Sequence, residues 1–322
     1  MILTVTPNPS LDRTFTVAGL RLGELNRAGI DTVEASGKGV NVARVLHAAG
    51  VRTGVVLPAG GLEGVHLGAL LDAEGLGHRI VPTDTPVRTN VTVLEVGRTT
   101  KVNAPGHPLA DGAADALVEA VADLALGADW VVCSGSLPPQ TPADLIRRIV
   151  EAGRRAGAQT AVDASGPALA AAAVDAAADL LSPNADELAE LTGRTLPPEG
   201  EPLVQAALDA AQLVATATGG SLLVSLGADG ALWVDAVTAW HAVAPPVTPV
   251  NTAGAGDALL AGWLSTTEPP ERQSPERQLR TAVAWGTAAC LLPATAGDVA
   301  KTARPDNVRI RTMHLGVPAV GP

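Results

Sequence analysis

The stretch PVNTAGAGDALLA, from Pro249 to Ala261, places glycines, one carboxylate and the start of an apolar helix within a few residues. Gly254 and Gly256 let the backbone turn sharply and approach a ligand, because neither residue carries a Cβ atom. The apolar run from Ala258 to Leu264 predicts a buried helix. The first N–H groups of such a helix lack internal partners and lie at the positive end of its dipole. Together these features predict an anion site.

Asp257 is expected at the mouth of this anion site. Asp often caps a helix, and on that interpretation its carboxylate only accepts hydrogen bonds from backbone N–H groups. The alternative is chemical. A carboxylate among amides that hold a phosphate can take the proton of a hydroxyl group that attacks this phosphate. The stretch by itself leaves capping and general-base phosphoryl transfer equally open.

A second glycine turn, SGKGVNVAR, spans Ser36 to Arg44 and opens a predicted helix. A solvated Lys in such a turn is common on protein surfaces. Lys38 is nevertheless one of only three lysines among 22 basic residues, the others being Lys101 and Lys301. Asn41 follows, and its amide can both donate to and accept from sugar hydroxyls. These two observations favour a ligand role for Lys38 and Asn41.

Polar residues also occur on two neighbouring segments that are expected to be strands. Arg88 and Asn90 lie at the start of the first, and Lys101 and Asn103 lie on the second. Arg can hold a phosphate with two parallel hydrogen bonds, whereas a lone Arg on a strand is usually solvated. Because other polar groups lie opposite Arg88, a phosphate contact and simple solvation are equally open for this residue.

Two further motifs follow predicted strands, where open α/β sheets bind ligands. In SPNADEL, Asn184 and Glu187 have the spacing of a helix start with an acid in its first turn. The functional alternative is a phosphate site with Mg²⁺ reached partly through water, since Mg²⁺ tends to keep its waters. SLGADGALW, from Ser225 to Trp233, is either a plain β-turn or a cup for a nucleotide.

Composition and absent motifs exclude several classes of protein. The chain has 322 residues, a net charge of −11 and 47% apolar residues, with no uninterrupted apolar run of the roughly 18 residues that a membrane span needs. The negative charge argues against a general nucleic-acid binder. Only Cys133 and Cys290 are present, and the amino terminus does not resemble a signal peptide, so we expect a cytoplasmic protein. The chain contains no GxxxxGK[ST] and no GxGxxG after the first strand, and its six histidines lack zinc-ligand spacing.

The chain alternates apolar strands with helices, which predicts a doubly wound α/β fold with a mostly parallel sheet flanked by helices. The predicted strands of this core are 2–6, 53–57, 130–134, 160–163, 180–182 and 221–225, with an antiparallel pair at 231–234 and 239–243. The predicted helices are 40–49, 65–74, 109–126, 142–156, 167–178, 185–191, 203–218, 255–265 and 275–292.

Four extended segments do not fit this alternation of strands and helices. They predict a small β lid made of two insertions, 12–35 and 88–103. The α/β core would then comprise 1–11, 36–87 and 104–300. The segment 301–322 would be a C-terminal tail, expected to be loop because it contains Arg, Pro and Gly with little pattern.

Seven motifs in combination resemble the PfkB family of ribokinase-like carbohydrate kinases. They are NPSLD, GKGVNVAR, GSLPP, DASG, PNADE, SLGADG and NTAGAGD, in the family's order and approximate spacing over residues 1 to 295. Ser182 stands where the family commonly has Lys, and Ser36 where it commonly has Gly. The resemblance implies ATP as the phosphoryl donor, Mg²⁺, and a lid that is often used for homodimer formation.

The resemblance also implies roles for individual residues. Asp257 would be the general base, and the amides of Gly254, Ala255 and Gly256 would form the anion hole. Glu187 would lie in the metal region, through water. The nucleotide would contact Asn184, Ser225, Gly227, Ala228, Gly230, Thr252, Gly254 and Gly256. The phosphorylated sugar would contact Asp12, Gly37, Lys38, Asn41, Arg88, Asn90, Lys101, Asn103 and Ser136.

Within the family, the strings GKGVNVARVL, VRTNV and VNAPG are most similar to those of the 1-phosphofructokinases. These enzymes phosphorylate the 6-hydroxyl of fructose 1-phosphate to give fructose 1,6-bisphosphate, so a phosphorylated ketohexose is the implied substrate. Tagatose-6-phosphate kinase and the family's 6-phosphofructokinase are the alternatives. A non-catalytic sugar-phosphate sensor is the alternative from another class, although a sensor needs no base at position 257.

Overall fold

The computed structural model describes residues 1–109, 112–142, 144–176, 178–266, 274–292 and 298–316. A ten-stranded sheet runs through the molecule in the order β14-β13-β12-β11-β10-β9-β8-β1-β4-β5. From β5 to β11 all neighbours are parallel, whereas β12 to β14 are antiparallel additions at one edge. The strands are β1 Ile2–Val5, β4 Thr53–Ala59, β5 His78–Pro82, β8 Trp130–Ser134, β9 Gln159–Asp163, β10 Leu180–Leu181, β11 Ser221–Ser225, β12 Ala231–Val234, β13 Ala239–Val243 and β14 Arg309–Met313.

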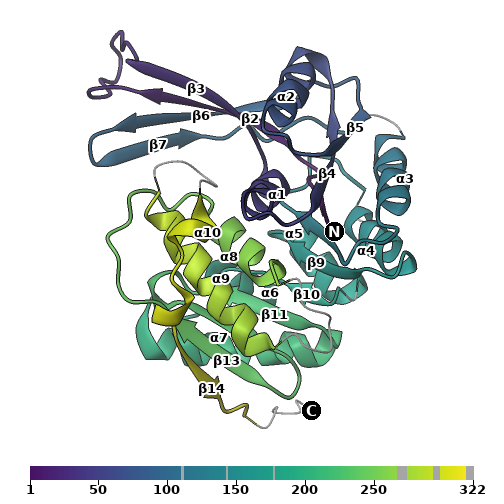
Figure 1. Cartoon of the computed structure of the whole chain (residues 1–322), viewed down its shortest axis with the longest axis vertical. Coiled ribbons are helices and arrows are strands. Elements are labelled where there is room, and N and C mark those ends of the chain that lie inside the picture. Colours follow the sequence, from purple (N-terminus) through teal and green to yellow (C-terminus); the bar gives the residue numbers. More distant parts are fainter. Residues whose placement is uncertain (110–111, 143, 177, 267–273, 293–297, 317–322) are drawn as a thin grey trace.

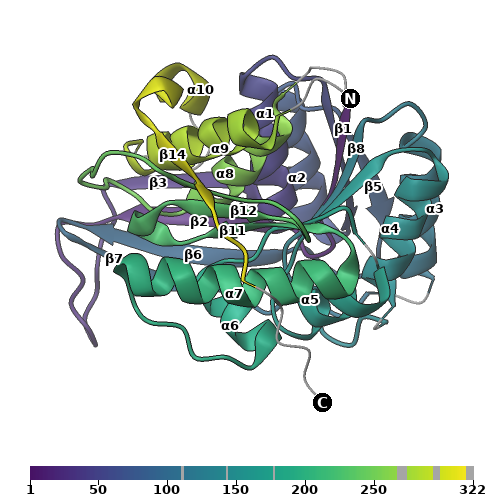
Figure 2. The same ribbon diagram turned by 90° about the horizontal axis from the view of Figure 1, so that it is seen from below.

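Helices cover both faces of this sheet (Figure 2). They are α1 Lys38–Ala48, α2 Gly61–Ala73, α3 Ala113–Leu124, α4 Leu145–Arg155, α5 Pro167–Ala171, α6 Ala185–Thr192, α7 Gly200–Thr218, α8 Ala255–Leu264, α9 Pro275–Cys290 and α10 Val299–Thr302. A π-helical turn, Ala172–Ala176, follows α5, and 3₁₀ turns occupy Gly227–Asp229 and Pro305–Asn307.

The strands are apolar on both sides because both sides are buried. On β8, Val131 and Cys133 pack into the core that contains α3, α4 and α7, while Trp130 and Val132 pack into the core of α1, α8 and α9. Continuous burial of this kind is what a parallel sheet between two helical layers requires. The predicted doubly wound α/β fold is therefore confirmed.

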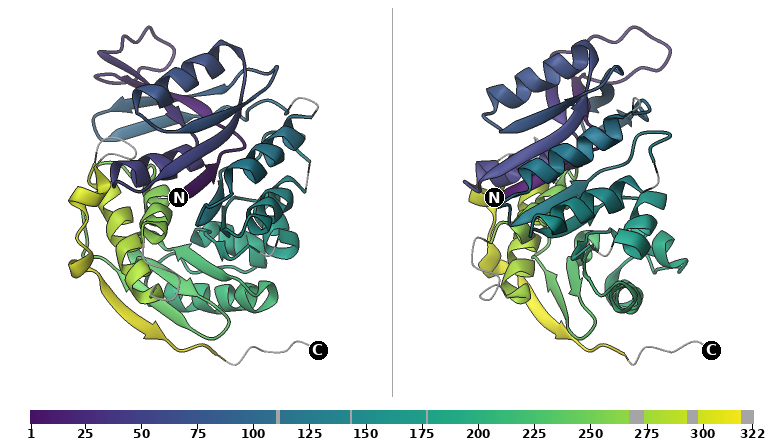
Figure 3. Two further views of the ribbon diagram at one scale, coloured as in Figure 1. Left: turned by 45° about the vertical axis from the view of Figure 1, so that its right-hand side comes forward. Right: turned by 90° about the vertical axis from the view of Figure 1, so that its right-hand side faces the viewer.

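A second, four-stranded sheet projects from the core (Figures 1 and 3). Its strands are β2 Ser10–Thr16, β3 Ile30–Ser36, β6 Arg88–Glu95 and β7 Arg98–Val102, in the order β3-β2-β6-β7. Strands β2 and β6 come from separate parts of the chain and pair in parallel. The prediction of a small sheet built from two insertions is therefore confirmed, and we call this sheet the lid.

Two predictions about the main sheet were wrong. The residues after Thr302 were expected to be loop, but Arg309–Met313 form β14, which pairs antiparallel with β13. The edge strand β5, His78–Pro82, was missed. Both are short strands with several exposed side chains, so neither shows the apolar run that marks a central strand.

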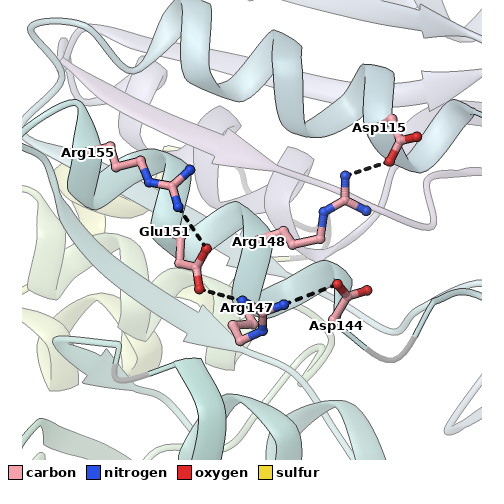
Figure 4. A network of polar contacts seen from close by, with 6 residues as sticks. All are labelled: Asp115, Asp144, Arg147, Arg148, Glu151 and Arg155. Carbon is pink, nitrogen blue, oxygen red and sulfur yellow. Dashed lines mark hydrogen bonds and ion pairs between the residues drawn. The ribbon is translucent and has the colours of Figure 1, made fainter.

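Ion pairs lie on the exposed surface of α4, and one of them, Arg148–Asp115, joins α4 to α3 (Figure 4). They are Arg147–Asp144, Arg147–Glu151, Arg155–Glu151 and Arg148–Asp115. Solvent screens these half-exposed pairs, so each is expected to stabilise the fold by at most about 1 kcal/mol.

Candidate functional site

A tight glycine turn places the start of α1 against the end of β1. Gly37 has a φ angle of 125°, and a Cβ atom there would lie 2.6 Å from Thr6 Cγ2. Only glycine fits this close approach. The turn is the structural reason for the SGKG sequence, and it places Lys38 at the carboxyl ends of the central strands.

Lys38 lies between two carboxylates from different elements. Its Nζ atom donates to Asp163 Oδ1 at the end of β9, at 2.8 Å, and lies 3.8 Å from Glu187 Oε1 on α6. Burial lowers the pKa of Lys38, but the charges of Asp163, Glu187 and Asp257 outweigh burial and raise the pKa above its ordinary value. Lys38 is therefore a fixed positive charge in this site.

Asp257, in the first turn of α8, is buried rather than at an open mouth, with 7% of its surface exposed. Its Oδ2 atom accepts a 2.8 Å hydrogen bond from the side-chain amide of Asn41 on α1. Burial and the nearby charge of Asp163 raise the pKa of Asp257 to about 7, although the Asn41 hydrogen bond and Lys38 act in the opposite direction. A carboxylate with this pKa can exchange a proton near neutral pH.

The amino terminus of α8 has the geometry expected of an anion site. Gly254, the residue before the helix, has a φ angle of 77°, and no side chain caps the helix. A Cβ atom added to Gly256 would meet nothing within 4 Å. Gly256 therefore borders open space, and the Ala255 N–H donates only a long, 3.4 Å hydrogen bond to the Thr252 carbonyl. An uncapped first turn of this kind suits an anionic ligand.

A cavity of about 480 Å³ opens beside these amides, and we call it the large cavity. It falls within the ordinary size range of small-molecule sites. Six residues expected to contact the nucleotide line it: Ser225, Gly227, Ala228, Gly230, Thr252 and Gly256. Ala255 of the expected anion hole also lines it, whereas Asn184 and Gly254 are not among its lining residues. Sequence reasoning missed the rest of the wall, formed by Ala244, Pro245, Pro246, Val247, Pro249, Leu259, Val283, Gly286, Thr287 and Cys290.

Asn184 and Glu187 form a capping box at the start of α6, as the simpler interpretation of SPNADEL proposed. The Glu187 N–H donates to Asn184 Oδ1 at 2.8 Å, and the Asn184 N–H donates to Glu187 Oε2 at 2.9 Å. Glu187 also lies near Lys38, so capping does not exclude a role at the site. Among the described residues, no group of three or more His, Cys, Asp or Glu side chains could hold a metal ion.

Several predicted sugar-phosphate residues meet where the lid joins the core. Asp12 Oδ1 accepts hydrogen bonds from Ser10 Oγ and from Asn90 Nδ2, at 2.7 and 2.9 Å. Arg88 donates to the backbone carbonyls of Ala104 and Asn8, at 2.7 and 3.0 Å. Burial lowers the pKa of Arg88.

The remaining predicted residues are less closely held. Ser136 Oγ accepts a 3.2 Å hydrogen bond from Asn8 Nδ2. Lys101 and Asn103 are exposed, on and just after the outer lid strand β7. The structure therefore groups Lys38, Asn41 and Asp257 through contacts with one another or with Asp163, but it does not draw Lys101 into that group.

Asp163 and Asn8 were missed as individual site residues. Asp163 follows a buried apolar strand, where the strand ends of an open α/β sheet meet, and this position was the available signal. Asn8 could not be found in this way, because its contacts with Pro105 and Ser136 span about a hundred residues of chain.

The site combines a carboxylate with a near-neutral pKa, a fixed cation, an uncapped helix amino terminus and a cavity of nucleotide size. No helix among the described residues is long and apolar enough to cross a bilayer. These features suit transfer of a phosphoryl group to a hydroxyl of a small molecule.

Comparisons with known proteins agree with this chemistry. Residues 7–301 match the model of the pfkB family carbohydrate kinases. A 1-phosphofructokinase of Rhodobacter capsulatus is 36% identical over 271 residues, which is 82% of each chain. The ATP-dependent 6-phosphofructokinase isozyme 2 of Escherichia coli is 35% identical over 293 residues, covering 90% of this chain and 92% of that protein.

The likeness extends to a solved structure. Escherichia coli phosphofructokinase-2 in complex with fructose 6-phosphate superposes with a TM-score of 0.82 at 32% identity, over 94% of this chain and 97% of the other. The match to the family model covers most of the chain. The chain therefore belongs to the pfkB family of carbohydrate kinases.

Proposed function

We propose that this sugar-phosphate kinase transfers the γ-phosphoryl group of ATP to the 6-hydroxyl of fructose 1-phosphate, giving fructose 1,6-bisphosphate. The observation that carries the proposal is the position of Asp257. It is a buried carboxylate with a pKa raised to about 7, in the first turn of α8, next to Ala255 and Gly256, which line the large cavity. A general base works best when its pKa is near the working pH.

In this mechanism Asp257 accepts the proton of the attacking hydroxyl group. The amides of Gly254, Ala255 and Gly256 stabilise the negative charge on the transferring group, and the large cavity holds the rest of the nucleotide. Lys38 supplies positive charge close to Asp257. Since phosphoryl transfer needs little covalent help from the protein, most of the rate should come from positioning and electrostatics.

Mg²⁺ fits the donor groups of the site only as a partly hydrated ion. Glu187 Oε2 already accepts a backbone hydrogen bond, and Oε1 faces Lys38. Mg²⁺ commonly retains several waters and binds through one or two carboxylates plus phosphate oxygens. Glu187 and Asp163 would hold it through such waters, and the ion would neutralise phosphate charge.

The sugar phosphate would lie under the lid, in contact with Lys38, Arg88 and the cluster around Asp12. The choice of fructose 1-phosphate is supported by the strings GKGVNVARVL, VRTNV and VNAPG. The relatives include both 1- and 6-phosphofructokinases at nearly equal identity, which keeps fructose 6-phosphate as an alternative substrate. Tagatose 6-phosphate remains the alternative that the sequence resemblance implies.

A coupled ADP-release assay with all three phosphorylated ketohexoses tests the proposal. The highest kcat/KM is expected for fructose 1-phosphate. A preference for either of the other two sugar phosphates would change the proposed substrate but would leave the proposed kinase mechanism intact. Binding of these sugars without ADP release would instead support the non-catalytic sensor.

The assembly, the domain division and the location are also part of the proposal. The lid, 12–35 and 88–103, would cover the sugar and pair with the lid of a second copy, since it exposes apolar side chains such as Val102 and Ile30. The core would comprise 1–11, 36–87 and 104–300, and the protein would work in the cytoplasm, where ATP is available. Light scattering that shows only monomers at micromolar concentration would exclude the homodimer.

A further inference from the structure

Arg44 lies one helical turn after Asn41 on α1 and uses its whole guanidinium group. Its Nε and Nη2 atoms donate to the Glu74 carboxylate, at 2.6 and 2.9 Å. Nη2 also donates to the backbone carbonyl of Ala35 on lid strand β3, at 2.6 Å. Nη1 donates to Asn41 Oδ1, at 3.3 Å. Only 15% of the Arg44 side chain is exposed, so these contacts hold it in one place.

The contact with Arg44 fixes which way the Asn41 amide faces. A guanidinium group can only donate, so the Asn41 atom that faces Arg44 must be the amide oxygen. The amide nitrogen then points the other way and donates to Asp257 Oδ2. If the amide turned over, its oxygen would face a carboxylate oxygen, and Asp257 would have to hold a proton to keep the hydrogen bond.

We propose that Arg44 is a positioning residue for the general base. By fixing the Asn41 amide, it keeps a hydrogen-bond donor on the ionised form of Asp257 and leaves the other carboxylate oxygen for the substrate hydroxyl. The inference rests on the proposed function, in which Asp257 acts as that base. Because Arg44 also holds Ala35, the arrangement links lid strand β3 to the base.

Other charged groups lie near the contacts that join Arg44, Asn41 and Asp257. Lys38 on α1 and Asp163 on β9 act on Asp257. Arg44 is faced by Glu74, just after α2, and by Glu34 on β3. Burial raises the pKa of Glu34, as do the charges of Glu74 and Asp12, whereas the charge of Arg44 lowers it. Replacing Arg44 leaves all of these groups in place.

The pH dependence of kcat separates positioning from stability. In Arg44→Met the acidic limb of kcat should move up by about half a pH unit to one unit, because Asp257 loses its fixed donor. At pH 7, kcat should fall about two- to fivefold, and it should approach the wild-type value above pH 9. The KM values for ATP and sugar phosphate should change less than kcat.

Two matched variants complete the experiment. Arg148→Met removes a comparable ion pair with Asp115 on the α3 and α4 surface and should leave the limb unmoved. Arg44→Lys keeps the positive charge, but one ammonium group cannot reach all three partners. It should therefore shift the limb as Arg44→Met does.

Two results would overturn the proposal. A wild-type profile in Arg44→Lys would mean that only the charge matters, and a loss of kcat that is equal at every pH would mean a purely structural role. The proposed function is tested separately. If the wild type released no ADP, ¹³C NMR titration of the Asp257 carboxyl would still decide the inference, which requires a higher pKa in Arg44→Met.

Discussion

The ammonium group of Lys38 lies 2.8 Å from the carboxylate of Asp163, and these two partners act on the pKa of Asp257 in opposite directions. Asp163 raises it, because a second negative charge nearby disfavours ionisation, and Lys38 lowers it. The ion pair therefore does more than join β9 to α1. It sets part of the electrostatic environment of the proposed base.

Substitutions of the two partners should move the pH dependence of kcat oppositely. Asp163→Asn should shift the acidic limb to lower pH, and Lys38→Met should shift it to higher pH. The position of the limb is the measurement, since the height of the profile also depends on how each variant binds substrate. Shifts of the same sign in both variants would contradict this assignment.

Asp257→Asn should lower kcat by about 10²- to 10⁴-fold, the usual contribution of a general base. ATP binding should be nearly unchanged, because the helix amides and the large cavity remain. Steady-state kinetics together with ATP titration would measure both quantities. A variant that keeps most of its turnover would remove Asp257 from the mechanism.

The same substitution should stabilise the protein at alkaline pH. The folded pKa of Asp257 is about 7, above its ordinary value of 3.8, so between these values the folded state holds a proton that the unfolded chain has released. Stability from this group therefore falls as pH rises from about 4 to 7 and stays low above 7. The free energy of unfolding of Asp257→Asn should exceed that of the wild type by a few kcal/mol at pH 8, the order of magnitude that the pKa shift corresponds to. At pH 5 the difference should be smaller. Denaturant unfolding at the two pH values would measure this difference.

Gly256→Val should weaken nucleotide binding without disturbing the fold. The new side chain meets no protein atom near its Cβ and would project beside the large cavity. Crowding of this kind commonly costs about 1–3 kcal/mol, so the KM for ATP should rise roughly 5- to 150-fold. Gly316→Val is the control, because that glycine also has open space around it and does not line the large cavity. Equal KM values in both variants would count against a nucleotide in this cavity.

Glu187→Gln should raise the Mg²⁺ concentration needed for half-maximal activity by several fold. Gln can still complete the capping box with Asn184, so α6 should remain stable, but the charge that favours a hydrated cation is lost. Activity measured over a Mg²⁺ titration, beside a melting temperature, would distinguish the two roles of Glu187. An unchanged Mg²⁺ requirement with a lower melting temperature would leave only the capping role.

The sequence by itself determined the fold class and the glycine turns at the candidate site. Apolar strands that alternate with helices predicted the doubly wound sheet, and the segments that broke this rhythm predicted the lid. The glycines around Asp257 predicted a sharp turn into a helix start, because local backbone conformation depends on neighbouring residues.

Only the tertiary structure decided the rest. Strand β14 forms because it pairs with β13, an edge strand some 70 residues earlier in the chain. The residues Arg309–Met313 alone give no sign of this partner. The pKa of Asp257 depends on burial, on Asp163 and on Asn41, which lies 216 positions away. Residue spacing reports which side chains share one face of a single element. Burial, hydrogen-bond direction and charge at a site depend on which elements pack together, and that is settled only when the whole chain folds.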